Sequence, residues 1–258
     1  MCRLLGIVAA APYDFNLVLC DAPRSMVALS HEHRDGWGMA LHPGTPSGEW
    51  VFHKSTQTAS EDPEFGKLAH ATQGRVLIAH VRQKTVGPVR AENTHPFRRG
   101  RWVFAHNGTL TALEALRREV SESRRAEMDG DTDSELFFAY LLTRLDADGL
   151  THEPVGPKTD EVVRRAVHDA TSRGDFGTLD ALLSDGVSLY AMRFGRPLYF
   201  LKREPATHAP HAGLVPIVER RCLVVASEPL TDEAWQLLDP GTLLRFEAGP
   251  IPLSTRVA

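Results

Sequence analysis

The sequence lacks three features that would define its surroundings. No apolar run in its 258 residues approaches the roughly 20 that a membrane-spanning helix needs. No charged segment leads into an apolar stretch with a small-residue cleavage site, so we expect no secretory signal and a cytoplasmic location. The formal net charge of -4 gives no basic field to hold a phosphate backbone. We therefore expect neither a membrane nor a nucleic acid among its partners.

Cysteine is also scarce, and its three positions (Cys2, Cys20 and Cys222) are widely spaced with no CxxC. Neither a disulfide framework nor a zinc knuckle follows from such a pattern. Histidine is plentiful, but no HExxH occurs. His31 and His33 would share a face only on a strand, and two ligands do not make a metal site. We expect no metal and no cofactor.

The pattern of apolar residues predicts strands, then helices, then strands again. Helices are expected within 13–30, over 62–73 with Asp62 as cap and Pro63 at the first helical position, and over 111–127, 132–145 and 159–185. Strands are expected over 2–10, 36–42, 49–55, 75–83, 101–108, 187–195, 197–203, 222–228 and 242–248, with a surface loop over 203–216. This order favours an α+β layered fold over a doubly wound sheet. We find no flexible linker and expect a single domain, 1–258.

The second position of the chain is occupied by Cys2, in "MCRLLGIVAA". One interpretation is a small apolar residue at the head of an edge strand, because free cysteine behaves as a small hydrophobe. The other is that Met1 is removed, which leaves the Cys2 thiol beside its own α-amine. An α-amine has a pKa of about 7.7 to 8.0, which suits a general base near neutral pH. This position alone does not decide between the two.

Two further strand ends carry side chains suited to acyl transfer. In "FAHNGTL", the Asn107 amide and the Gly108 backbone N–H could donate to one developing oxyanion, although Asn-Gly is also the commonest tight-turn dipeptide. In "IAHVRQKTVG", the planar guanidinium of Arg82 could bind a carboxylate in two places, and Thr85 could add a hydroxyl contact. A surface arginine at a strand end is the alternative.

The segment "GDTDSELFFAYLL" begins an amphipathic helix with acidic and hydroxyl side chains. Asp131 or Thr132 could cap this helix, and Glu135 could complete a capping box from Thr132. Asp133, close to the same helix start, could bind a substrate ammonium group. The structural and the functional roles are compatible because they use different residues.

Together these motifs resemble a known family. "MCRLLG", "RDGWGMAL", "AHVRQ", "ENTHPF", "FAHNGTL" and "GDTDSE" occur in the order seen in class II glutamine amidotransferases, most closely the stand-alone YafJ-like group. The similarity covers most of residues 2–145 with specific motifs and the later strands more loosely. It implies an N-terminal nucleophile hydrolase fold, a four-layer αββα sandwich of two mainly antiparallel sheets between helical layers.

The resemblance also implies a role for each matching residue. Cys2 would be the nucleophile with its own α-amine as base, and Asn107 and Gly108 would form the oxyanion hole. Arg82 would bind the α-carboxylate of the substrate and Asp133 its α-ammonium. His95 and Pro96, together with His106, would shape the pocket.

One departure concerns the loop after Arg82. Sugar-amidating members of the family have a "WATHG"-like loop, whereas this chain has "QKTVG", which keeps Thr85 and Gly87 but places Val86 at the histidine position. We therefore expect glutamine-side recognition without that acceptor chemistry. The expected substrate is glutamine or another γ-glutamyl amide, and transfer of ammonia would need a separate synthase. Two alternatives stay open: a hydrolase like that of the ergothioneine pathway, and a non-catalytic γ-glutamyl-binding subunit or sensor.

Overall fold

The computed structural model describes residues 2–71, 73–84, 88–111, 113–203, 221–249, 253–256 and 258. Two seven-stranded sheets dominate this part of the chain, and the strand pairs within both are antiparallel. Within the same residues, no helix is both long and apolar enough to span a membrane.

The first sheet holds the N-terminal strand at its centre. Its order is β12 (Gln236–Leu237), β10 (Tyr199–Arg203), β11 (Cys222–Ala226), β1 (Arg3–Asp14), β4 (Gln73–Val81), β2 (Trp37–His42) and β3 (Val51–Ser55). Arg3 lies opposite Val81 in the β1–β4 register, and Leu5 lies opposite Ala226 in the β1–β11 register. The start of β1 therefore lies between the ends of β4 and β11.

The second sheet stacks against the first. Its order is β14 (Leu253–Arg256), β13 (Thr242–Glu247), β9 (Ser188–Phe194), β8 (Gly177–Ser184), β6 (Trp102–His106) and β5 (Phe97–Arg99), and the short β7 (Thr109–Leu110) pairs with β8. The first and second sheets meet through a shared apolar layer that includes Leu4, Val8 and Ile78 on one side and Ala105 and Leu182 on the other.

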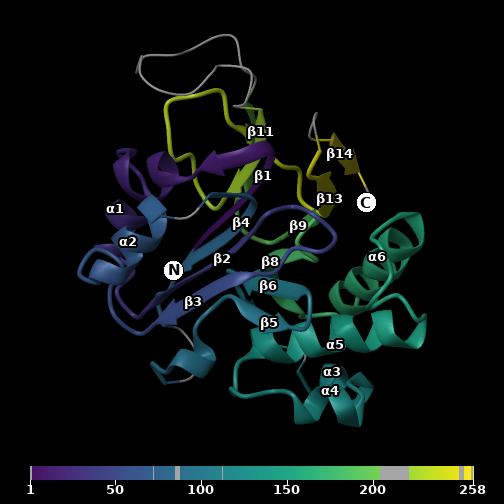
Figure 1. The fold of residues 1–258 in the computed structure, drawn as a ribbon. Helices are drawn as coiled ribbons and strands as arrows, with labels where there is room; N and C mark the ends of the chain where they lie inside the picture. The colour runs from purple at the N-terminus through teal and green to yellow at the C-terminus, as the bar shows by residue number, and fades with distance from the viewer. Residues whose placement is uncertain are drawn as a thin grey trace.

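Helices cover the two outer faces of the sandwich (Figure 1). The π-helical turn η1 (Leu17–Asp21), α1 (Met26–Ser30) and α2 (Pro63–Ala71) lie on the first sheet, with Met26 and Phe65 buried against it. On the second sheet lie α3 (Leu113–Glu119), α5 (Asp133–Ala147) and α6 (Pro157–Thr171), whose apolar residues share a core with β6, β8 and β9. The short α4 (Glu122–Ala126) has no buried residue and packs on α5. The four-layer arrangement expected from the resemblance is thereby confirmed.

Local signals located several elements correctly. Asp62 caps α2, since its Oδ1 accepts the Glu64 N–H at 3.0 Å and Pro63 is the first helical residue. Thr132 caps α5, where its hydroxyl accepts the Glu135 N–H at 3.2 Å. The Glu135 carboxylate does not close a capping box, because it instead accepts the N–H groups of Asp129 and Gly130 at 3.0 and 2.7 Å.

Two helical predictions need correction. The expected helix over 159–185 ends with α6 at Thr171, and its second half is the strand β8. The segment "LDALL" has helical propensity, but it lies in β8, which begins at Gly177 with φ 94° and pairs with both β6 and β9. The expected helix over 111–127 breaks at Ser121, whose side chain caps α4. Most of the loop expected over 203–216 lies outside the described residues.

Candidate active site

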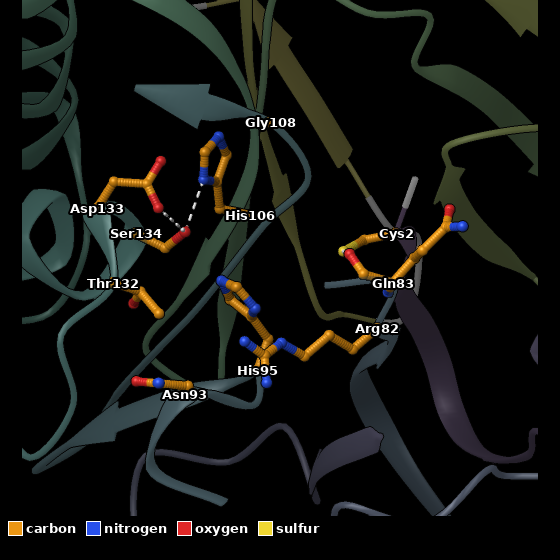
Figure 2. Close-up of a pocket in the computed structure, with 10 residues that line it drawn as sticks. All are labelled: Cys2, Arg82, Gln83, Asn93, His95, His106, Gly108, Thr132, Asp133 and Ser134. Carbon is orange, nitrogen blue, oxygen red and sulfur yellow. Dashed lines mark hydrogen bonds between the residues drawn. The ribbon is translucent and has the colours of Figure 1, made fainter. Parts of the chain in front are cut away.

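An open pocket of about 320 Å³ lies where the start of β1 meets the start of α5 (Figure 2). Five segments of the chain line it, with the residues Cys2, Arg82, Gln83, Asn93, His95, His106, Gly108, Thr132, Asp133 and Ser134. Figure 2 shows Cys2 and Gln83 on one side and Asp133 and Ser134 across from them, with His95 between. The two sheets and α5 thus each contribute side chains to one cavity.

The Cys2 thiol forms hydrogen bonds with the backbone of Gln83. Its Sγ is 3.3 Å from the Gln83 carbonyl oxygen, which accepts the thiol proton, and 3.3 Å from the Gln83 nitrogen, whose N–H can donate to a thiolate. Burial raises the pKa of the Cys2 thiol, and the Gln83 N–H and the charge of Arg82 oppose this rise. The resting thiol is therefore protonated at neutral pH, and attack requires a base.

Arg82 brings a buried cation to the pocket. It follows β4 directly and is only 4% exposed. Its backbone N–H and carbonyl are held by Gly36 and Asp35 at 2.8 and 3.0 Å, and its guanidinium donates to the Pro88 carbonyl at 3.3 Å. Burial lowers the pKa of Arg82, but an arginine in a protein stays charged. A buried fork of this kind suits a carboxylate ligand.

A chain of contacts links the start of α5 to β6. Asp133 is 6% exposed, and its Oδ2 accepts the Leu110 N–H at 2.7 Å, which leaves Oδ1 near the Ser134 hydroxyl at 3.4 Å. His106 donates from Nε2 to the Thr178 carbonyl at 2.9 Å and accepts from Ser134 at Nδ1, 2.8 Å away (Figure 2). Burial lowers the pKa of His106, so its ring is neutral.

Gly108 occupies a position where no larger residue fits. A Cβ added there would lie 2.2 Å from the Thr178 carbonyl oxygen and 2.4 Å from Nε2 of His106. Its neighbour Asn107 is not among the residues that line the pocket. The Asn107 amide donates to Oγ of Ser227 at 3.2 Å, beside the first residues of β1.

His95 places an unsatisfied imidazole in the pocket wall. It is 6% exposed, and neither of its ring nitrogens has a hydrogen-bond partner among the described residues. Its ring contacts that of His80 in a tilted arrangement, with centroids 4.5 Å apart and an interplanar angle of 40°. Burial lowers the pKa of His95 well below its usual value and that of His80 to about 3, so both rings are neutral. Both His95 nitrogens are buried beside the pocket.

Asn93, the last residue of η2 (Ala91–Asn93), contacts the loop that precedes α5 beside the pocket. Asn93 is fully buried, and its amide exchanges two hydrogen bonds with Asp131, of 2.7 Å to Oδ1 and 3.1 Å from the backbone N–H. Gly130 packs so closely that an added Cβ would lie 2.4 Å from Oδ1 of Asn93. The motifs "ENTHPF" and "GDTDSE" are thus joined by direct contact.

The structure brings together five of the seven site residues proposed from sequence: Cys2, Arg82, His106, Gly108 and Asp133. Asn107 lies outside the lining, and Thr85 falls outside the described residues. Sequence analysis assigned no site role to Gln83, Asn93, Thr132 or Ser134. Asn93 and Ser134 stand within quoted motifs and could have been noticed, whereas Gln83 contributes its backbone, which leaves no side-chain signal.

Comparison with known proteins gives a consistent result over nearly the whole chain. The family model for class II glutamine amidotransferases matches residues 1–257. Escherichia coli YafJ is 31% identical over 96% of this chain and 98% of its own. The gamma-glutamyl-hercynylcysteine sulfoxide hydrolase of Mycobacterium tuberculosis is 28% identical over 91% of this chain and 87% of its own.

A solved structure agrees with the sequence relatives. The crystal structure described as a predicted glutamine amidotransferase from Pseudomonas aeruginosa superimposes with a TM-score of 0.65 at 26% identity, covering 98% of this chain and 100% of that one. The matched region includes both sheets and the pocket between them. This protein belongs to the class II glutamine amidotransferase family.

Proposed function

We propose that this protein hydrolyses the γ-amide of glutamine or of a γ-glutamyl conjugate, with Cys2 as the nucleophile. The observation that carries the proposal is the convergence of a thiol, a buried guanidinium and a buried carboxylate on one pocket, from segments as distant as β1 and α5. A free γ-glutamyl group has a carboxylate and an ammonium at one end and an amide carbonyl at the other. The pocket offers a partner for each of these groups.

Arg82 and Asp133 would bind the α-carboxylate and the α-ammonium of this substrate, respectively. Both side chains are buried, at 4% and 6% exposure, so each is expected to discriminate strongly against an analogue that lacks its partner group. His95 would add a hydrogen bond from its unpartnered imidazole. Binding at this end would direct the γ-carbonyl toward Cys2.

The chemical steps follow from the protonated state of the thiol. Once Met1 is removed, the α-amine of Cys2 accepts the thiol proton as Sγ attacks the γ-carbonyl carbon. The Gly108 N–H and the second N–H of the Asn107 amide would stabilise the oxyanion. The C–N bond then breaks, the amine passes its proton to the departing nitrogen, and a γ-glutamyl thioester remains. Water hydrolyses the thioester to release glutamate and restore the thiol.

The leaving group is ammonia if the substrate is glutamine, and an amine if it is a conjugate. The relative from Mycobacterium tuberculosis, named for hydrolysis of a γ-glutamyl conjugate, supports the second possibility. Delivery of ammonia to an acceptor would require a separate synthase. A non-catalytic γ-glutamyl-binding role is the remaining alternative, and retention of Met1 would favour it because the α-amine would be blocked.

The test combines intact mass with labelling by 6-diazo-5-oxo-norleucine, a glutamine analogue that alkylates the nucleophile. We expect loss of Met1 and one adduct on Cys2. Burial raises the pKa of both Cys20 and Cys222 to about 11, so neither competes as a thiolate. Labelling at either of them would contradict the assignment.

Two variants separate the roles of the thiol and the amine. Cys2→Ala is expected to abolish glutamine hydrolysis while circular dichroism stays unchanged. Insertion of one alanine before Cys2 keeps the thiol but converts its amine into a peptide nitrogen, and it should also abolish turnover. Full turnover by the insertion variant would contradict the proposed base.

A further inference from the structure

Ser227 and Glu228 connect the nucleophile segment to the Asn107 amide, although neither residue lines the pocket. They directly follow β11, whose end lies beside the first residues of β1. We propose that this dipeptide is a positioning element that sets the distance between the Cys2 thiol and the oxyanion donor Asn107. The inference rests on the proposed function and deepens it.

The hydroxyl oxygen of Ser227 accepts hydrogen bonds from both sheet regions. Its Oγ accepts the Leu4 backbone N–H at 3.0 Å, and its own N–H donates to the Leu4 carbonyl at 3.0 Å. The same Oγ accepts from the Asn107 amide at 3.2 Å. Leu4 belongs to the first sheet, and Asn107 follows β6 of the second. The hydroxyl therefore bridges the two sheets next to the proposed chemistry.

Glu228 acts on the same segment through a second contact. Its Oε2 accepts from Nε of Arg3 at 2.7 Å, and another nitrogen of that guanidinium donates to the Cys2 carbonyl at 3.2 Å. Both side chains are partly buried, at 21% and 26% exposure. The carboxylate thus orients a donor onto the peptide group that follows the nucleophile.

Such an element is needed because the thiol and the oxyanion donor are carried by different sheets. The thiol is carried by the start of the chain in the first sheet, whereas the amide is carried by a strand end 105 residues later in the second. Strand pairing within either sheet does not set their separation. A displacement of about 1 Å can cost about 100-fold in rate, so a direct link between the two is needed. The Ser227 hydroxyl supplies it.

The inference predicts a specific kinetic signature for Ser227→Ala. We expect kcat for glutamine hydrolysis to fall about 10-fold to 100-fold, because the oxyanion donor loses its orientation. KM should change less than about twofold, because the substitution leaves the proposed substrate-binding side chains, Arg82 and Asp133, in place. Alkylation of Cys2 by iodoacetamide, which needs only the thiol, should keep its rate. Ser227→Thr retains the hydroxyl and is expected to restore kcat to within about threefold.

Glu228→Gln is expected to lower kcat in the same way, by about 3-fold to 10-fold, because the guanidinium of Arg3 loses its charged partner. The matched control is Glu233→Gln, which neutralises the partly buried Arg203–Glu233 ion pair on the same sheet, where neither residue lines the pocket. This control should retain wild-type kcat and KM.

The outcomes distinguish this inference from the function on which it rests. Suppose that the wild type is active, that Cys2→Ala is inactive and that Ser227→Ala has a normal kcat. This result contradicts the positioning role and leaves the proposed function intact. A fall in kcat that Ser227→Thr does not restore, or one matched by slower iodoacetamide alkylation, contradicts it too. Absence of wild-type turnover on any γ-glutamyl amide contradicts the proposed function. In that event the position of the Asn107 amide in a crystal structure of Ser227→Ala decides the inference: a displaced amide supports it and an unmoved one overturns it.

Discussion

Asp133→Asn provides a sharp test of substrate recognition because it removes a charge with little change in shape. Oδ2 of Asp133 accepts the Leu110 N–H at 2.7 Å, and an asparagine oxygen can keep that hydrogen bond. The variant should therefore fold and melt close to the wild type. What it loses is the negative charge that we assign to the α-ammonium of the substrate.

The size of the effect follows from burial. A hydrogen bond to a charged group contributes about 1.5–3 kcal/mol, and a buried charge left without its partner costs about 3–5 kcal/mol. The 6% exposure of Asp133 places the loss where the two ranges meet, at about 3 kcal/mol. We expect kcat/KM for glutamine to fall roughly 150-fold, at about 1.4 kcal/mol per tenfold.

The assay compares glutamine with glutaramic acid, the same amide without the α-ammonium. The wild type should have a kcat/KM for glutamine that exceeds that for glutaramic acid by a similar factor. In Asp133→Asn this ratio should fall below about tenfold, because the α-ammonium no longer has a carboxylate to bind. Asp129→Asn is the matched control, since its side chain on the same loop is 70% exposed. If Asp133→Asn discriminates as strongly as the wild type, the ammonium is bound elsewhere.

Two further predictions concern packing and pH. Gly108→Ala should lower the free energy of unfolding, measured in urea, by about 1–3 kcal/mol and reduce kcat, because its Cβ would meet the Thr178 carbonyl at 2.2 Å. The control is Gly66→Ala within α2, where the Cβ meets open space. This variant should raise the free energy of unfolding by about 0.5–1 kcal/mol. Burial lowers the pKa of His80 from 6.5 to about 3, so the unfolded chain binds its proton first. The resulting stability is complete above pH 6.5 and is lost as the pH falls, by about 2 kcal/mol between pH 7 and pH 5. Urea titrations at the two pH values check this, and an equal loss in His80→Phe would contradict it.

The elements with strong local signals could be predicted from sequence alone. The strands β1, β4 and β6 contain apolar runs, and α2 and α5 begin at side chains that cap them. Such signals act between residues a few positions apart, which the order of amino acids specifies directly. Prediction failed at β8, where "LDALL" favours a helix but pairing with two neighbouring strands decides the structure.

The sequence by itself determined which residue types suited to amide hydrolysis are present and in what order. They are a thiol at Cys2, a guanidinium at Arg82 and a carboxylate at Asp133. Only the tertiary structure decided which of them meet. Gly108 lines the pocket while the adjacent Asn107 turns to Ser227, a partner 120 positions away. The physical reason is that such contacts depend on how the two sheets stack and in what register, and neighbouring residues in a chain carry no information about either.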